Sequence, residues 1–361
     1  MLHGSYRIEH FQPAHETQVL KLLEPLWKHA PSLSTRLFRW KYYDNPYAPQ
    51  VLGIVASLNG QVVGFRGYFS SPFELDGYDS AIGVLFPGDT CVDPRHRRKG
   101  LSVAMGELAM ETFSLTHELF LNTSCTQNSL PGYLRLGFHP LTPKIPLVRY
   151  NFGALFWNAR SSPRARLPLL RRTRATGRYG DVLVAHRPLS KPMASIIDSE
   201  PHMRVTLRPL QDEAFFRWRY CNPVRRYIFY YLVRNREVKA YVVIGRSAAG
   251  LFGRILDYAE REDGNIREIL EFVTNAGHFV RLSVLSFAIP EPIRQVFVDL
   301  GFSSVRTSER LSERRPERRP VLPVLVRPTR KSFSDRDFFV QDLDVRKMES
   351  WSLKPICSDA A

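Results

Sequence analysis

The pattern of apolar and polar positions over residues 1–150 alternates between helical stretches and short apolar runs. Apolar side chains recur at helical spacing over residues 15–29 and again over 33–43, which predicts two helices in succession. Aliphatic runs then predict strands over 51–57 and 61–69, joined by a tight Asn-Gly turn.

The same reading continues to the end of this first part. It predicts a short strand at 5–11, a hairpin over 73–86, a helix over 101–115, a strand over 118–124, a helix over 129–136 and final strands over 138–150. The order is therefore β, α, α, three β, α, β, α, β. This order predicts an α/β fold in which helices cover both faces of a mixed sheet.

A cationic loop lies between the predicted hairpin and the helix that begins at Leu101. It contains Arg97, Arg98, Lys99 and Gly100. The start of a helix exposes unpaired N–H groups and the positive end of the helix dipole. A strand, a cationic glycine-containing loop and a helix in this order therefore predict a site for a phosphate or pyrophosphate group.

This loop resembles the acyl-CoA-binding motif of the GNAT acyltransferase superfamily, which is Arg or Gln, two residues, Gly, one residue, then Gly or Ala. Arg97 and Gly100 fill the first two places, and Ser102 stands in the third as a small departure. The resemblance implies that CoA contacts Cys91, Val92, Arg97, Arg98, Lys99, Gly100, Leu101 and Ser102. The alternative interpretation is a basic turn that caps a surface helix.

A second resemblance to the superfamily lies in Tyr133, Gly137 and Phe138, which match its Tyr-x-x-x-Gly-Phe pattern. It implies that Tyr133 faces the CoA sulfur as general acid. Asn128 matches an asparagine that relatives direct towards the CoA arm, although it precedes Tyr133 by five residues where seven are common. The alternative for Tyr133 is an aromatic side chain that packs at the helix end.

The chemistry of acyl transfer needs a donor for the thioester carbonyl and a route for the proton of the amine. In the superfamily the backbone at the strand end supplies the donor, which here is residues 90–92. Cys91 is interpreted as a packed small residue and not as a nucleophile. Asp89 lies where relatives often place an acidic residue, which implies that it attracts the ammonium and accepts its proton. The alternative is that Asp89 caps a turn with Gly88.

The second part of the chain repeats short sequence motifs of the first. Residues 216–223 repeat the motif of 38–46, and residues 300–302 repeat Leu-Gly-Phe at 136–138. These repeats predict a tandem duplication of one fold. The stretch 257–266 is acidic where the cationic loop should lie, and Phe297 stands near the place of the tyrosine. The second copy is therefore predicted not to bind CoA.

Taken together, the fold prediction is two tandem GNAT-like domains, each a mixed, mostly antiparallel sheet flanked by helices. The predicted divisions are a GNAT domain at 1–150, a basic Pro/Arg-rich connection at 151–202, a degenerate domain at 203–345 and a tail at 346–361. Within the connection, residues 152–178 could contact a membrane surface as an amphipathic helix. The competing interpretation is that their apolar residues pack on a domain.

Composition narrows the class of protein further. The chain has 361 residues and a formal net charge of +16, which suits a polyanionic small molecule such as CoA, an anionic membrane surface or nucleic acid. No uninterrupted apolar run reaches about 18 residues, which excludes an evident transmembrane helix, and a cytoplasmic location is expected. Four scattered cysteines predict reduced thiols, and no metal site is expected.

The function predicted from the resemblance is an acyl-CoA-dependent N-acyltransferase, most simply an acetyltransferase. Acetyl-CoA or another acyl-CoA is the expected co-substrate, and the amine of a small acceptor, such as an amino sugar or an amino acid that could be anionic, attacks it directly. No specific nucleic-acid partner is expected. The alternative is a non-catalytic CoA-binding protein, or a basic protein associated with membrane or nucleic acid, built on the same duplicated fold.

Overall fold

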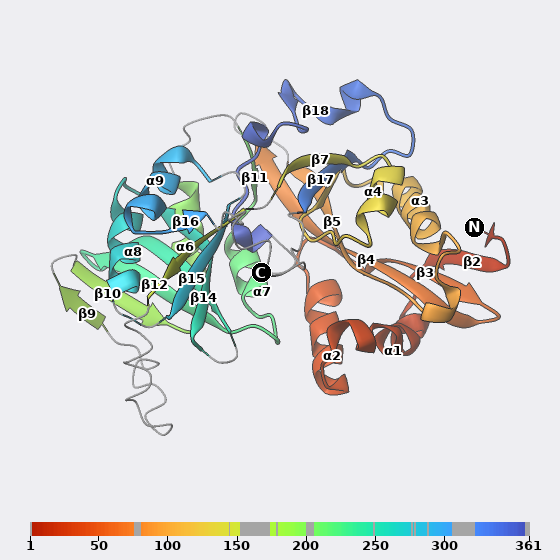
Figure 1. The fold of residues 1–361 in the computed structure, drawn as a ribbon, viewed down its shortest axis with the longest axis horizontal. Helices are drawn as coiled ribbons and strands as arrows, with labels where there is room; N and C mark the ends of the chain where they lie inside the picture. Colours follow the sequence, from red (N-terminus) through yellow and green to blue (C-terminus); the bar gives the residue numbers. More distant parts are fainter. Residues whose placement is uncertain are drawn as a thin grey trace, which may run out of the picture.

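The structure, a computed structural model, contains two mixed sheets with helices on both faces of each (Figure 1). It describes residues 2–75, 81–143, 145–151, 174–177, 180–199, 206–247, 250–275, 277, 279–286, 289–304 and 322–357. The predicted α/β fold is confirmed. The membrane-facing helix predicted within 152–178 falls almost entirely outside the described residues.

The first sheet has the order β1-β2-β3-β4-β5-β6-β17-β7, with β11 added along β4. Its strands are β1 (Leu2–His3), β2 (Tyr6–His10), β3 (Leu52–Leu58), β4 (Gln61–Leu75), β5 (Ile82–Val92), β6 (Leu119–Asn122), β7 (His139–Pro143), β11 (Leu207–Pro209) and β17 (Pro323–Pro328). β4 runs unbroken to Leu75, because its far end pairs with both β5 and β11, whereas the sequence pattern predicted a break after 69.

Two pairs of helices cover the first sheet. One face packs on α1 (Glu16–Trp27), α2 (Pro31–Phe38) and the π-helical turn η2 (Arg39–Tyr43), through buried residues that include Val19, Phe38 and Phe65. The other face packs on α3 (Leu101–Phe113) and α4 (Leu130–Arg135). The positions of all four helices agree with the sequence pattern to within a few residues.

The second sheet has the order β16-β8-β15-β14-β13-β12-β10-β9. Its strands are β8 (Ile145–Tyr150), β9 (Arg174–Gly177), β10 (Gly180–Ala185), β12 (Tyr227–Arg234), β13 (Glu237–Arg246), β14 (Phe252–Glu260), β15 (Arg281–Ser286) and β16 (Ser303–Ser304). Its helices are α6 (Ser190–Asp198) and α7 (Glu213–Arg219), which contribute to one buried cluster, and α8 (Asn265–Asn275) and α9 (Glu291–Asp299), which contribute to another.

The two sheets exchange strands across the predicted domain limits. β8 follows β7 directly in the chain but pairs with β15 of the second sheet. β17 comes from the far end of the chain and inserts between β6 and β7 of the first sheet. The limits at 150 and 203 therefore do not separate the sheets, and β9, β10 and α6 give part of the predicted connection a regular structure.

The repeated motif forms a symmetric contact between the halves. The indole N–H of Trp40 donates to the carbonyl of Trp218, and the indole N–H of Trp218 donates to the carbonyl of Trp40, each at 2.7 Å. The two rings stack with centroids 5.6 Å apart. An open groove of about 850 Å³ passes over this pair, lined among others by Arg36, Arg39 and Arg217.

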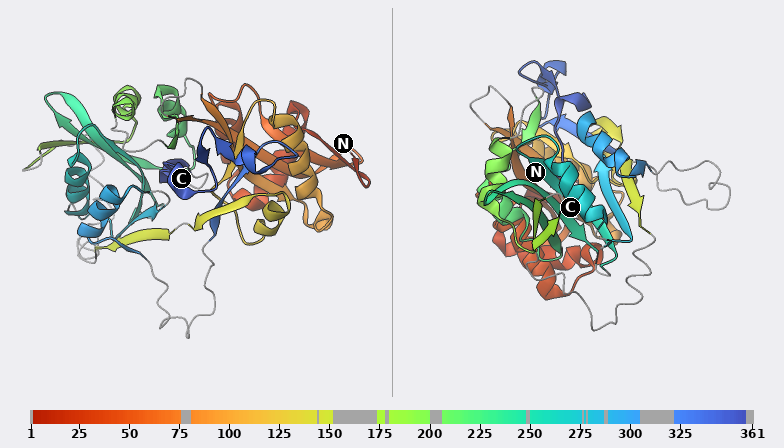
Figure 2. Two further views of the ribbon diagram at one scale, coloured as in Figure 1. Left: turned by 90° about the horizontal axis from the view of Figure 1, so that it is seen from above. Right: turned by 90° about the vertical axis from the view of Figure 1, so that its left-hand side faces the viewer.

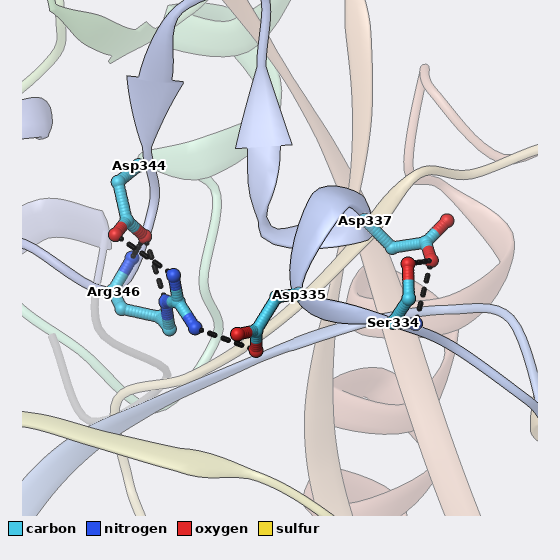
Figure 3. A network of polar contacts seen from close by, with 5 residues as sticks. All are labelled: Ser334, Asp335, Asp337, Asp344 and Arg346. Carbon is cyan, nitrogen blue, oxygen red and sulfur yellow. Dashed lines mark hydrogen bonds and ion pairs between the residues drawn. The ribbon is translucent and has the colours of Figure 1, made fainter.

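The C-terminal segment returns from the first sheet to the second. After β17, Arg346 holds a turn together by bonding to Asp335 and Asp344, while Asp337 accepts from the hydroxyl and N–H of Ser334 (Figure 3). Residues 351–357 then run between the two sheets and end in the short helix η8 (Pro355–Cys357) (Figure 2). The segment is therefore a further connection between the two halves.

Candidate functional site

The strands β5 and β6 separate from each other near the middle of the first sheet. They run parallel and pair only at Val84 with Leu119 and at Leu85 with Phe120. β5 stays paired with β4 as far as Val92, so its other edge is open beyond Leu85. A strand edge of this kind presents backbone N–H and C=O groups to a ligand.

The pairing of β4 with β5 fixes which N–H groups point to the open edge. The N–H of Asp93 donates to the carbonyl of Val63, which places the next hydrogen-bonded pair at Phe65 and Cys91. Because bonding alternates along an antiparallel pair, the N–H groups of Thr90 and Val92 point away from β4. These are the groups that the resemblance predicted to receive a thioester carbonyl.

A bulge lies just before these residues. Arg66 pairs with Thr90 but Tyr68 pairs with Pro87, so β5 carries one extra residue at Gly88 and Asp89. A bulge bends and twists the strand that contains it. It therefore contributes to the separation of β5 from β6.

The loop after β5 leads into α3 in the predicted way. Gly100 precedes the helix with φ +75°, and Arg98 also has a left-handed backbone at φ +62°. The N–H groups of Val103 and Ala104 donate to the carbonyl of Gly100, which leaves those of Leu101 and Ser102 directed outward from the helix start. The first turn of α3 has no acidic residue and no side-chain cap.

The side chains of the loop divide into exposed cations and structural contacts. Arg97, Arg98 and Lys99 are exposed, and the Arg97 Nε donates to the carbonyl of Val92 at 2.9 Å. The Leu101 side chain is buried, so only its backbone N–H can reach a ligand. The exposed cations and the helix start together suit a pyrophosphate.

The hairpin of β1 and β2 holds this loop in place, which the sequence pattern did not predict. A ring nitrogen of His3 bonds to the carbonyl of Lys99 at 2.8 Å. The hydroxyl of Tyr6 accepts from Lys99 Nζ and bonds to His96 Nδ1, each at 3.0 Å. These contacts join residues 90 or more positions apart, and no local pattern could have indicated them.

Tyr133 lies against a buried arginine. Its side chain is 5% exposed, its ring meets Phe138 edge-on at 5.0 Å, and the guanidinium of Arg66 lies 4.8 Å from its ring centroid. Arg66 Nη1 donates to the carbonyl of Ser102 at 2.9 Å. Arg66 therefore links the tyrosine to the first turn of α3.

Arg66 remains a cation in this setting. Burial by itself lowers the pKa of Arg66, but its interactions with the phenols of Tyr68 and Tyr133 outweigh burial and raise the pKa above its ordinary value. Its Nε is buried and has no hydrogen-bond partner within the part of the chain that the structure describes. A fixed cation beside a phenol stabilises the phenolate that remains after the tyrosine donates a proton.

Asp89 points to the opposite face of the sheet from Arg66. Its carboxylate accepts from Trp27 Nε1 at 2.8 Å, from Lys41 Nζ at 2.9 Å and from the Tyr42 hydroxyl at 2.8 Å. Burial raises the pKa of Asp89, but the charge of Lys41 and these hydrogen bonds outweigh it and hold the pKa below the ordinary value. These contacts favour a structural role and count against Asp89 as a proton acceptor.

The remaining predicted residues lie at the edge of the site. The Cys91 thiol donates to the carbonyl of Leu22 at 3.3 Å, and burial raises its pKa, as suits a packed residue. Asn128 is exposed in the turn before α4. The position seven residues before Tyr133 is Thr126, which bonds to Ser129 and shapes the same turn.

The second half contains counterparts for several parts of this site. The hydroxyl of Tyr220 donates to Asp257, as Tyr42 does to Asp89. Phe297 meets Phe302 edge-on at 5.2 Å, as Tyr133 meets Phe138. Gly264 precedes α8 with φ +95°, as Gly100 precedes α3. The two halves can therefore be compared residue by residue.

In the second half the chain fills these places with its own groups. Glu260, whose side chain is buried, accepts from the N–H of Ile266 at 2.7 Å and so occupies the start of α8. β14 pairs with β15 only as far as Ile255 with Val284, and η8 contacts both strands. The carbonyl of Ile356 there accepts two bonds from Arg219.

The open strand pair, the bulge and the loop before a helix define the fold of the GCN5-related N-acetyltransferases. Among solved structures, the chain is similar to a probable N-acyltransferase from Enterococcus faecalis, with a TM-score of 0.61, 11% identity and coverage of 92% of this chain and 74% of that one. A GCN5-related N-acetyltransferase from Anabaena variabilis has a TM-score of 0.57 and 12% identity, with coverage of 90% of this chain and 73% of that one. A GCN5-related N-acetyltransferase from Kribbella flavida has a TM-score of 0.56 and 10% identity, with coverage of 90% of this chain and 71% of that one.

These similarities confirm the GNAT fold over most of the chain. No family model matches the sequence, and no curated protein matches it either. Across the described ranges, no helix is both long and apolar enough to span a membrane. The same residues contain no group of three or more His, Cys, Asp or Glu side chains placed to hold a metal ion.

Proposed function

We propose that the first half transfers an acyl group, most simply acetyl, from acyl-CoA to the amine of a small acceptor, and that the second half is not catalytic. The observation that carries the proposal is the difference between the two equivalent sites. In the first, the start of α3 has no carboxylate cap and β5 has an open edge. In the second, Glu260 and η8 occupy the same two places.

The proposed reaction uses groups on both sides of the open edge. The pyrophosphate of CoA binds the N–H groups at the start of α3 and the cations Arg98 and Lys99. The thioester carbonyl accepts from the N–H of Val92 or Thr90, which stabilises the negative charge that develops on its oxygen. The amine attacks the carbonyl carbon, so that a C–N bond forms and the C–S bond breaks.

Two proton transfers complete the reaction. The leaving thiolate takes a proton from the Tyr133 hydroxyl, and Arg66 stabilises the phenolate until it is reprotonated. The attacking nitrogen loses its extra proton to solvent, because the Asp89 carboxylate is already engaged by three donors. The acceptor side of the sheet is then the face covered by α1 and α2.

The acceptor is proposed to be a small amine, with anionic amines included. The groove over Trp40 and Trp218 lies beside α2 and presents Arg36, Arg39 and Arg217, with Asp44 and Glu213 also in its lining. Its cations support an acceptor that carries a carboxylate or a phosphate. They do not distinguish an amino sugar from an amino acid.

The test is a thermal-shift panel of acyl-CoAs, followed by a thiol-release assay across amines and amino sugars. We expect stabilisation by at least one acyl-CoA and amine-dependent release of free CoA. Stabilisation without release under any acceptor would favour a non-catalytic CoA-binding protein. No response to CoA, together with salt-dependent binding to anionic vesicles or DNA, would overturn the proposal.

A further inference from the structure

A cluster of arginines in the second half lies apart from the acyl-CoA site and from its filled counterpart. Arg225, Arg246, Arg254 and Arg281 line a hollow of about 210 Å³, together with Ser247 and Ser283. We call this the arginine hollow. It lies where β14 and β15 begin, whereas η8 contacts the region of Asp257 further along β14.

The sheet register places Arg254, Arg281 and Ser283 on one face. Arg254 pairs with Ser283 of β15 on one side and with Gly245 of β13 on the other. Arg281 is two residues before Ser283 on the same strand, so its side chain has the same orientation. Gly245 has no side chain, and the side chain of Leu256 lies against it at the wall of the hollow.

Three of the four arginines that line the arginine hollow have no carboxylate partner among the described residues. Arg246, Arg254 and Arg281 form no ion pair with the part of the chain that the structure describes. Burial, and then repulsion by Arg225 and Arg281, lower the pKa of Arg254. The Nε of Arg281 is buried and has no hydrogen-bond partner among the described residues. A buried donor without an acceptor destabilises the fold.

Other arginines of the same half show that pairing is usual here. Arg234 bonds to both oxygens of Glu268 at 2.7 Å, and Arg267 pairs with Asp299. Arg294 pairs with Glu291. These three arginines each have a carboxylate partner, whereas Arg246, Arg254 and Arg281 of the hollow have none among the described residues.

We propose that the arginine hollow binds a phosphate group of a small molecule. Guanidinium groups match tetrahedral oxyanions with paired N–H donors, and several of them converge here. The volume lies below the roughly 300 Å³ at which sites for drug-sized ligands begin, which suits a phosphate group and not a whole nucleotide cofactor. A nucleic-acid backbone would instead call for cations spread along an open surface.

The experiment measures the melting temperature of the full chain as sodium phosphate or pyrophosphate replaces sodium chloride at constant ionic strength. We expect a saturable rise for the wild type. Arg254→Gln should weaken the apparent affinity by about tenfold or more, because it removes a charged hydrogen-bond partner. It should not lower the melting temperature without phosphate, because it also removes repulsion.

Three further variants keep the result interpretable. Arg267→Gln removes one positive charge elsewhere in the same half and should keep the full phosphate response. Arg281→Lys keeps the charge but loses the forked donor geometry, so it tests the hollow even if Arg254→Gln does not fold. Arg98→Gln removes a cation of the proposed CoA loop, and the response of the arginine hollow should survive in it.

The proposal is overturned if Arg254→Gln and Arg281→Lys respond to phosphate as the wild type does. It is also overturned if the melting temperature of the wild type does not rise as phosphate replaces chloride. Tighter, steeply salt-dependent binding of a single-stranded oligonucleotide that depends on the same arginines would assign the hollow to nucleic acid instead.

Discussion

The two halves of the molecule have the same fold and the same aromatic motif, but they differ at two equivalent places, which are the start of a helix and the edge of a strand. At the start of α3 the backbone N–H groups of Leu101 and Ser102 face outward, whereas at the start of α8 the N–H of Ile266 is bonded to Glu260. The edge of β5 is open beyond Leu85, whereas the edge of β14 is covered by η8.

The comparison teaches how a copy of a binding fold becomes a structural domain. The places that bind a ligand in an open copy are places of unsatisfied backbone groups, and these must be satisfied by something in a copy without ligand. In the second half the Glu260 carboxylate accepts from the N–H of Ile266, and the Asp257 carboxylate accepts from the N–H of Tyr258. Under the proposed function, loss of binding and gain of stability are then two results of the same contacts.

The largest effect is expected from removal of the hydroxyl that distinguishes Tyr133 from Phe297. Tyr133→Phe should lower kcat by about 100-fold or more, since general acid catalysis contributes on that scale. The dissociation constant of acyl-CoA should change little. Steady-state thiol release and a binding titration measure the two quantities. Tyr231→Phe, a buried tyrosine of the second half, is the matched control, and equal activity of both variants would remove Tyr133 from the mechanism.

The contact of η8 with the second sheet can be weakened by a substitution that leaves the proposed acyl-CoA site unchanged. Ile356 has a fully buried side chain between the sheets, and Ile356→Ala should lower the free energy of unfolding by about 3 kcal/mol. Leu115→Ala, at a side chain that is 85% exposed, should change it by less than about 0.5 kcal/mol. Denaturant unfolding measures both. If Ile356→Ala lowers the free energy of unfolding no more than Leu115→Ala does, η8 does not cover the edge of β14.

The Asp89 carboxylate offers a pH-dependent test of its structural role. Asp89→Asn should reduce stability by about 2 kcal/mol at neutral pH, because Lys41 loses its buried charge partner. Since the pKa of Asp89 is held below 3.8 in the folded state, this contribution is present above that value and is lost as the pH falls through the folded pKa.

Unfolding by urea at several pH values should therefore show a constant gap between wild type and Asp89→Asn from about pH 5 to 8, which narrows only in stronger acid. If instead Asp89→Asn is as stable as the wild type and abolishes acyl transfer, the carboxylate acts on the substrate and the original hypothesis from the sequence is restored.

Much of the fold and part of the site could be predicted from the sequence, and particular residues show where prediction ended. The helices, the loop of Gly100 and the repeated motif are local patterns, so periodicity and spacing indicated them. The exchange of β8 and β17 could not be predicted, because either strand satisfies the same pattern in either sheet. Arg66 was missed because it stands inside an apolar strand, and its contact with Tyr133 depends on the packing of α3 and α4.

The smallest effect is expected where the first half is given the carboxylate of the second. Asp89 and Asp257 are equivalent, since each accepts from a tyrosine of the repeated motif. Val92 lies three positions after Asp89, and Glu260 lies three positions after Asp257, so Val92 occupies the place of Glu260. Val92→Glu should therefore weaken acyl-CoA binding by about tenfold, through repulsion of the pyrophosphate and competition for the start of α3.

Val92→Gln has the same size without the charge and separates the two causes. We expect Val92→Gln to bind acyl-CoA within about threefold of the wild type, since an amide neither repels a phosphate nor satisfies a helix start as a carboxylate does. A titration followed by intrinsic fluorescence measures both constants. Equal weakening in the two variants would mean that side-chain size, and not a self-supplied anion, is what distinguishes the two halves.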